Sequence, residues 1–344
     1  MPDRCVAVAV GAVVLCCAMS TASATFVGPL PPPNPDTAGA ATNPGRAPVP
    51  GATAGNFTNN IMLTGYWPPT GSMLRQFSTN STQNPDGWVG ENWEGRGYNI
   101  HSFFPEFPNG QSGANARGVG DFEIDYQDTV SDWNRITAEI RPIAIITFSW
   151  TGSQPSQYGN RGWELEARNR NRSSWTNDYL APFQPTLSPP DRSVPANHVR
   201  YSSLPMDGIL EAVNTADVGV TSYVDDFSPG FGGTFLSEFI GYHGVWYHDT
   251  HSEPFSDNWN IAAGHIHVGS NTTVAQGAAA TEITLRVLTE YLDSVISDAW
   301  LTGLEGVRGI GGNPPNTIQV PQIPAPSTAL VLGCIAGAGL RRRR

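Results

Sequence analysis

The sequence predicts an α/β fold: a three-layer α/β/α sandwich around a mainly parallel central sheet, in a single domain. Three observations support this prediction. Short apolar runs that suit strands alternate with segments whose apolar residues recur at helical spacing. The joins between these segments are short. The run 142–148 is almost wholly apolar, which is typical of a strand that is buried on both faces of a sheet.

The first half of the domain predicts three strands and one helix. Residues 61–64 read as a short apolar strand that ends at Gly65, and 122–126 as a second strand. A helix follows, with caps expected at Asp128 and Thr129. Its apolar residues recur at helical spacing, at Val130, Trp133, Ile136 and Ile140. The apolar run 142–148 completes this half as a buried strand.

The second half continues the alternation of helices and strands. Apolar residues at 206, 209, 210 and 213 predict an amphipathic helix, and 218–223 resemble a strand. A Gly-Gly turn leads into the apolar segment 234–247. A strand is predicted at 261–268, and a last long helix at 283–295. Because sites in such sheets gather at the carboxyl ends of the strands, the reactive residues are expected there.

Both ends of the chain are typical of export and sorting signals. Arg4, the apolar run 5–19 and the small residues 22–24 predict a secretory signal peptide, 1–24. The tail 324–344 combines Pro-Ala-Pro-Ser-Thr, a short apolar stretch and four arginines. It resembles the PEP-CTERM signal that an exosortase recognises, with Ala325 in place of the usual Glu. We expect an exported protein of the cell envelope or the exterior, transiently tethered to the membrane by this tail; a lipoprotein signal and a marginal membrane anchor are the alternatives.

Composition delimits the domain and excludes some partners. Residues 25–58 and 303–323 are rich in Pro, Gly and Asn and predict linkers, which leaves one domain at 59–302. The four cysteines lie outside this domain, at Cys5, Cys16, Cys17 and Cys334, so we expect no disulfide to stabilise it. The formal net charge is −11. Such a surface repels nucleic acid and anionic lipid, and we exclude both as partners.

Six segments of the domain, in consistent order, resemble pyroglutamyl peptidase type I (pyrrolidone-carboxyl peptidase). The resemblance covers about 61–296, with insertions at 79–118 and 151–162. The segments are Leu-Thr-Gly-Tyr-Trp-Pro-Pro at 63–69, Arg-Pro-Ile-Ala-Ile-Ile at 141–146, Glu-Leu-Glu-Ala-Arg-Asn at 164–169, Tyr-Ser-Ser-Leu-Pro at 201–205, Gly-Thr-Phe-Leu-Ser-Glu at 233–238 and Gly-His-Ile-His-Val at 264–268. The same α/β fold is implied.

The resemblance also implies a catalytic triad. That family uses Cys, His and Glu, and the matching positions here are Ser237, His267 and Glu164, with Glu166 as a rival for the carboxylate. A hydroxyl needs a base to take its proton, and a carboxylate can orient the imidazole. Ser237 is expected in the first turn of a helix, where free backbone N–H groups favour a developing anion. Unlike a thiol, the hydroxyl does not ionise at rest.

Several positions depart from the family pattern. Tyr66 and Trp67 replace residues that flank the pyrrolidone ring in the family, and with Asn169 they are the candidate substrate-binding residues. Ordinary core packing is the alternative for both aromatic residues. Glu238 replaces an Asn and would oppose an oxyanion if its side chain faced inward. Ser237 and His267 have the simpler interpretation of a small core residue and a satisfied core histidine.

A metal site is a competing hypothesis. His243, His248, His251, His265 and His267 lie close in sequence, and the last two share one face of a strand, which suits metal ligation. His243 and His248 are five residues apart rather than four, and no complete metal motif is present. We therefore predict no metal and no cofactor.

The sequence thus predicts an exported, serine-type relative of pyroglutamyl peptidase that cleaves an N-terminal pyroglutamyl or similar small amide bond. The expected partners are a small peptide substrate and an exosortase-type sorting enzyme. The alternatives are a non-catalytic binding protein of the cell envelope that keeps the peptidase fold, and a metal-dependent hydrolase. The sequence does not predict the oligomeric state.

Overall fold

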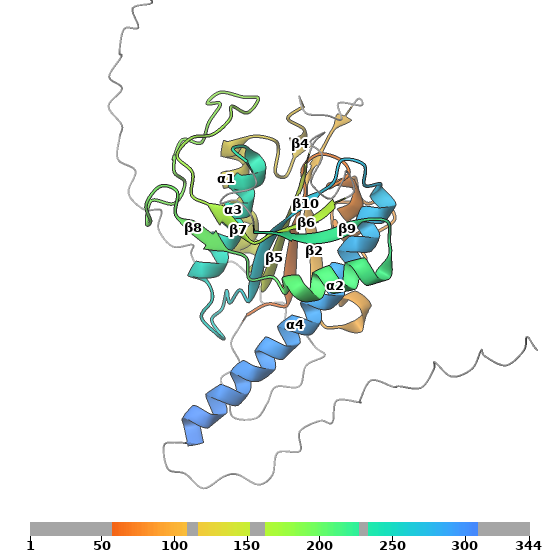
Figure 1. Cartoon of the computed structure of the whole chain (residues 1–344), viewed down its shortest axis with the longest axis vertical. Helices are drawn as coiled ribbons and strands as arrows, with labels where there is room; N and C mark the ends of the chain where they lie inside the picture. Colours follow the sequence, from red (N-terminus) through yellow and green to blue (C-terminus); the bar gives the residue numbers. More distant parts are fainter. Residues whose placement is uncertain (1–56, 109–115, 152–161, 227–232, 309–344) are drawn as a thin grey trace, which may run out of the picture. The chain divides into compact units, whose positions relative to one another are not determined.

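A six-stranded sheet occupies the centre of the computed structural model, which describes residues 57–108, 116–151, 162–226 and 233–308 (Figure 1). The strand order is β2-β1-β5-β10-β6-β9. Neighbouring strands are parallel except β10 and β6, which pair antiparallel. The predicted α/β fold with a mainly parallel sheet is therefore confirmed. The strands are β1 (Asn60–Thr64), β2 (Asn99–Phe103), β5 (Ala144–Trp150), β6 (Gly162–Glu166), β9 (Thr221–Asp225) and β10 (Ala262–Val268).

Helices cover both faces of this sheet (Figure 1). One face carries α1 (Tyr126–Ile140) and α3 (Leu236–Thr250), and the other carries α2 (Met206–Ala216) and α4 (Val274–Arg308). Each face buries its own apolar cluster. On β10, Ala263 belongs to the cluster under α1 and α3, and Ile266 belongs to the cluster under α2 and α4. This alternation follows from the two-residue period of a strand.

Short elements complete the described part of the chain. Two small ladders lie outside the main sheet: β3 (Pro105–Glu106) with β4 (Val119–Gly120), and β7 (Arg168–Arg170) with β8 (Val199–Tyr201). Two 3₁₀ helices, η2 (Ser72–Phe77) and η3 (Trp93–Gly95), lie between β1 and β2 in the chain. The ladder of β7 matters for the site, because β7 follows β6 directly and contacts α3.

The predicted strand at 122–126 is wrong, and so are the caps predicted for the helix that follows. Phe122 adopts a left-handed backbone with φ of 55°, which breaks an extended segment. Asp125 is the N-cap of α1, and its side chain accepts hydrogen bonds from the backbone N–H groups of Gln127 and Asp128. The helix therefore begins before the expected caps at Asp128 and Thr129. The other strands and helices predicted in 59–302 are present.

The predicted signal peptide and sorting tail lie outside the described residues, as do the linker 25–58 up to residue 56 and the rest of the second linker beyond Arg308. α4 continues to Arg308, into the range predicted as linker. Within the part of the chain that the structure describes, no helix is both long and apolar enough to cross a membrane.

Candidate active site

Four ionisable side chains meet on the α3 side of the sheet, where β10 and β6 pair. His265 and His267 are two residues apart on β10, and Glu164 and Glu166 are two residues apart on β6, so each pair shares one face of its strand. The antiparallel register sets His267 opposite Glu164, and His265 opposite Glu166. His267 lies near the carboxyl end of β10. This is where the sequence predicted reactive residues.

His267 forms its ion pair with Glu166. The His267 Nδ1 and Glu166 Oε1 atoms are 2.8 Å apart, although the two residues are diagonal rather than directly opposite. The Glu164 Oε2 atom instead accepts a hydrogen bond from the Tyr223 hydroxyl at 2.8 Å. Of the two carboxylates that the sequence left open, the structure thus pairs Glu166 with the imidazole. Glu164 stays close enough for its charge to act on His267.

Burial and charge give this pair unusual protonation. Burial alone would lower the pKa of His267, but Glu166, Glu164 and Glu238 raise it to about 9. Burial alone would raise the pKa of Glu166, but His267 and the hydrogen bond from Asn169 hold it below its usual range. Burial raises the pKa of Glu164 to about 7, against the opposing effect of His267. At neutral pH the pair is an imidazolium and a carboxylate.

His265 is a neutral neighbour of the pair. Its ring lies 4.8 Å from the His267 ring in an edge-to-face arrangement, and its Nδ1 atom is 2.7 Å from the Thr147 hydroxyl. Burial lowers the pKa of His265 to about 3. At neutral pH His265 is therefore uncharged, and it is a polar but neutral neighbour of His267.

The amino end of α3 lies beside this cluster. Gly233, with φ of 74°, adopts a left-handed backbone just before the helix, and Ser237 lies in its first turn, as predicted. Ser237 is 9 % exposed, and its hydroxyl has no hydrogen-bond partner among the described residues. The next residue, Glu238, is fully buried and faces inward: one carboxyl oxygen accepts a hydrogen bond from the backbone N–H of Arg170.

Asn169 links the carboxylates rather than facing an open pocket. It is fully buried, and its Nδ2 atom donates a hydrogen bond to Glu166 Oε2 at 2.6 Å. The close approach of α3 depends on Gly241, because a Cβ atom there would lie 2.7 Å from Asn169 Nδ2. The substrate-binding role predicted for Asn169 stays a prediction. Its observed hydrogen bond engages one oxygen of Glu166.

Tyr66 and Trp67, the predicted substrate-binding aromatics, are both buried. The Tyr66 hydroxyl lies 3.2 Å from the Thr129 hydroxyl, and Trp67 Nε1 donates to the carbonyl of Ala116 at 3.2 Å. Trp67 also stacks on Phe235, the N-cap of α3, with ring centroids 5.9 Å apart. Trp67 therefore lies next to the start of the helix that carries Ser237, and Tyr66 is packed against α1.

Buried polar atoms without hydrogen-bond partners gather around the cluster. Besides Glu238 and Asn169 they include side-chain atoms of Thr64, Ser149 and His265. The parallel register places Ser149 beside His267, and Thr64 beside Thr147. Native proteins leave few such groups unpaired, and functional sites are among the places where they occur. Thr147 and Ser149 were not predicted as site residues; their two-residue spacing in an otherwise apolar strand was the available signal.

The metal hypothesis receives limited geometric support. Within the described residues, Glu166, His265 and His267 form one group whose ligand atoms lie within 4.8 Å of one another. Tetrahedral zinc with bonds of 2.0–2.2 Å brings neighbouring ligand atoms to about 3.3 Å. Any two of these ligand atoms that lie farther apart than this would have to move closer together to share one ion. His243, His248 and His251 do not belong to this group.

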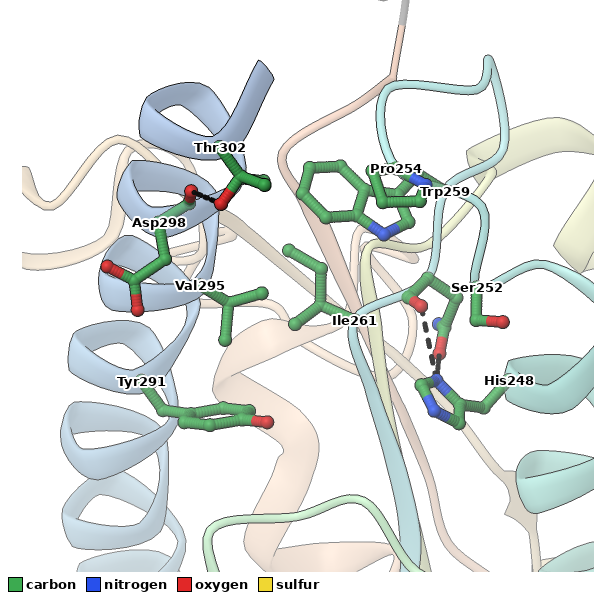
Figure 2. Close-up of a pocket in the computed structure, with 11 residues that line it drawn as sticks. His248, Ser252, Pro254, Trp259, Ile261, Tyr291, Val295, Asp298 and Thr302 are labelled. Carbon is green, nitrogen blue, oxygen red and sulfur yellow. Dashed lines mark hydrogen bonds between the residues drawn. The ribbon is translucent and has the colours of Figure 1, made fainter. Parts of the chain in front are cut away.

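A cavity of about 350 Å³ lies elsewhere, between α4 and the segment that leads into β10 (Figure 2). Its apolar wall includes Trp259, Ile261 and Val295, and His248 on its rim lies 3.1 Å from the carbonyl of Asn260. Ile261 precedes β10, whereas His267 is near the carboxyl end of that strand. This cavity is therefore separate from the cluster around His267.

The structure is similar to those of solved pyrrolidone carboxyl peptidases. The enzyme of Thermococcus litoralis has a TM-score of 0.47 and 14% identity, with 68% of this chain and 95% of that chain covered. The enzyme of Pyrococcus furiosus has a TM-score of 0.46 and 14% identity, with 68% and 99% covered. A mutant of the latter has a TM-score of 0.44 and 15% identity, with the same coverage. No model of a known protein family matches this chain, and no curated protein matches its sequence.

Proposed function

We propose that this chain is a hydrolase of small amide bonds in which Ser237 is the nucleophile, His267 the base and Glu166 the orienting carboxylate. One observation carries the proposal: a buried imidazole–carboxylate pair, His267 with Glu166, lies near the carboxyl end of β10 and beside the first turn of α3. Glu166 takes the role that the resemblance suggested for Glu164. Glu164 then acts through its charge alone.

The proton would move from Ser237 to His267 as the hydroxyl attacks the amide carbon. With Nδ1 held by Glu166, the other ring nitrogen, Nε2, is the atom that accepts this proton. It would then pass to the leaving amine, and water would release the acyl group by the same route. The free N–H groups at the start of α3 would stabilise the oxyanion. Ser237 must first come into hydrogen-bond contact with Nε2, as catalytic groups often do when substrate binds.

The raised pKa of His267 sets the conditions for this chemistry. Only the neutral imidazole accepts a proton, and Glu166, Glu164 and Glu238 raise its pKa to about 9. The active fraction therefore grows as the pH rises through this value. We propose an enzyme whose activity increases on the alkaline side of neutrality.

The substrate class follows from the sequence resemblance. Six segments match the pattern of pyroglutamyl peptidases, and the aromatic residues Trp67 and Phe235 stack at the start of α3. We propose a small peptide with a pyroglutamyl or similarly blocked N-terminus as substrate. The terminal signals add export to the cell envelope or exterior, transient tethering by the tail, and an exosortase-type enzyme as partner.

The test is hydrolysis of a pyroglutamyl reporter by the wild type, Ser237→Ala, Ser237→Cys and His267→Asn. The wild type should be active at alkaline pH, and Ser237→Ala and His267→Asn should each lose about 10⁴-fold or more in kcat, as expected for members of one catalytic unit. Equal rates for the wild type and Ser237→Ala would remove Ser237 from the mechanism.

The same variants distinguish the non-catalytic alternative. A wild type without turnover whose Ser237→Cys variant is active would keep the scaffold and the base but not the serine chemistry. That result, together with binding of a pyroglutamyl peptide to the wild type, would favour a binding protein of the cell envelope. Inactivity of both, without binding, would contradict the substrate class as well.

A further inference from the structure

Glu238 is a buried acid in an unusual position for the first turn of a helix. A Glu at the third helical position commonly turns back to the N–H group of the N-cap. Glu238 instead points toward the sheet and accepts a hydrogen bond from the backbone N–H of Arg170, at the end of β7. Its side chain is fully buried, and its second oxygen, Oε2, has no hydrogen-bond partner.

Asn169 lies between Glu238 and the carboxylate that pairs with His267. It donates from Nδ2 to Glu166, and its side chain also lowers the pKa of Glu238. Its own carbonyl oxygen, Oδ1, is buried and also lacks a donor. Two buried acceptors, Asn169 Oδ1 and Glu238 Oε2, therefore lack a donor, and their side chains are neighbours because Glu238 is bonded to the backbone of Arg170, the residue after Asn169. Leaving buried acceptors unpaired destabilises the folded chain.

A single proton on Glu238 would give both acceptors a hydrogen bond. We infer that Glu238 is a neutral carboxylic acid that donates a hydrogen bond from Oε2 to Asn169 Oδ1, and that it acts as a positioning residue for the His267–Glu166 pair. Asn169 is then fixed with its Nδ2 toward Glu166, whose other oxygen faces His267. The chain Glu238–Asn169–Glu166–His267 has a donor at every step. Its effect on the base rests on the proposed function, but the protonation of Glu238 does not.

The surroundings of Glu238 favour its neutral form. Burial and the negative charge of Glu166 raise the pKa of Glu238 to about 8. The backbone N–H group of Arg170, the positive charge of Arg172 and the side-chain amide of Asn169 oppose that shift. His267 faces it from β10, and the nearby positions of β5, Thr147 and Ser149, carry no charge. Arg200 of β8 forms its ion pairs with Asp191 and Asp249.

Infrared spectroscopy of the whole chain tests this inference without using turnover. The wild type at pH 6.5 should show the carbonyl band of a buried protonated carboxylic acid, which should disappear on titration through about pH 8. Glu238→Gln, which keeps a donor for Asn169, should lack this band and keep the thermal stability of the wild type. Glu238→Ala, which leaves both acceptors unpaired, should lower the melting temperature.

Glu164→Gln is the matched control, because Glu164 also has a raised pKa. If the carboxylic-acid band is still present in Glu164→Gln and still disappears near pH 8, the inference is supported even if Glu238→Gln fails to fold. A band lost in Glu164→Gln and kept in Glu238→Gln would overturn it. So would a melting temperature lowered equally by Glu238→Gln and Glu238→Ala. Because none of these measurements needs a substrate, an inactive wild type would contradict the proposed function and leave this result standing.

Discussion

At the scale of single residues, the choice of partner for His267 depends on what surrounds each glutamate. Glu164 lies directly opposite His267, but the Tyr223 hydroxyl holds one of its oxygens. Glu166 is diagonal, and a diagonal neighbour in an antiparallel pair is within reach of a long side chain. Asn169 fixes the second oxygen of Glu166, so that the first faces the imidazole. Glu166, the more deeply buried of the two, has the lowered pKa and stays ionised, whereas the pKa of Glu164 is raised.

Glu166→Gln should lower the pKa of His267 more than Glu164→Gln does. Removing the paired charge should shift the imidazole titration down from about 9 by at least about one pH unit, or ~1.4 kcal/mol. Glu164→Gln should shift it less, because Glu164 interacts with His267 through charge alone. The imidazole titration followed by NMR measures both. A larger shift for Glu164→Gln would return the orienting role to Glu164.

At the scale of elements, two glycines of α3, Gly241 and Gly244, lie where the helix packs against the site. Gly241 allows Asn169 to approach the helix. A Cβ atom added at Gly244, one turn later, would lie 3.8 Å from Thr147 and 4.0 Å from Ile145. Gly is intrinsically poor in a helix, by about 1 kcal/mol relative to Ala. Its presence at position 241 is explained by the close approach of the buried amide.

Gly241→Ala and Gly244→Ala form a matched pair within this helix. Both gain the same helix propensity of about 1 kcal/mol, but only the Cβ atom at 241 meets a polar atom at 2.7 Å. We expect Gly244→Ala to be neutral or stabilising. Gly241→Ala should be destabilising, and it should change the pKa of His267 by displacing Asn169 from Glu166. Chemical denaturation and the NMR titration test this, and equal effects of the two substitutions would contradict it.

At the scale of the whole molecule, the site couples stability to pH. His267, Glu164 and Glu238 have pKa values raised to about 9, 7 and 8. Each therefore holds a proton in the folded chain that the unfolded chain releases, and its contribution is lost as pH rises through its folded pKa. Burial has the opposite effect on His101, His243 and His265, whose lowered pKa values weaken the fold as pH falls below 6.5.

The free energy of unfolding should therefore be highest near pH 6.5 or slightly below, and should fall toward pH 9. Each group with a raised pKa contributes a slope of up to about 1.4 kcal/mol per pH unit within its own window. Guanidinium denaturation at pH 6.5 and pH 9 measures the difference. Glu238→Gln should reduce it, because the amide does not titrate. A stability that stays constant or rises over this range would contradict these pKa directions.

How much the sequence predicted depends on how local the responsible interaction is. Apolar runs were sufficient for β5 and β10, and helical spacing of apolar residues was sufficient for α1, α2 and α4; α3 was expected only as an apolar segment after a Gly-Gly turn, with Ser237 in the first turn of a helix. It failed at 122–126, where apolar residues precede a cap at Asp125 and Phe122 takes a left-handed backbone. Motif spacing singled out His267 and left Glu164 and Glu166 open. The choice between them depends on Tyr223 and Asn169, whose contacts exist only in the folded chain.

The antiparallel ladder between β10 and β6 has a consequence of its own. Its two histidines and two glutamates repeat with the same two-residue step. If β6 slipped by two positions, one glutamate would take the place of the other, and His267 would still have a carboxylate next to it. A slip by one position would instead turn both glutamates to the opposite face of the sheet, the face covered by α4, where Trp163 now contacts Thr284. The arrangement therefore tolerates even shifts in the pairing of these strands, and insertions or deletions that shift it by an odd number would abolish the site.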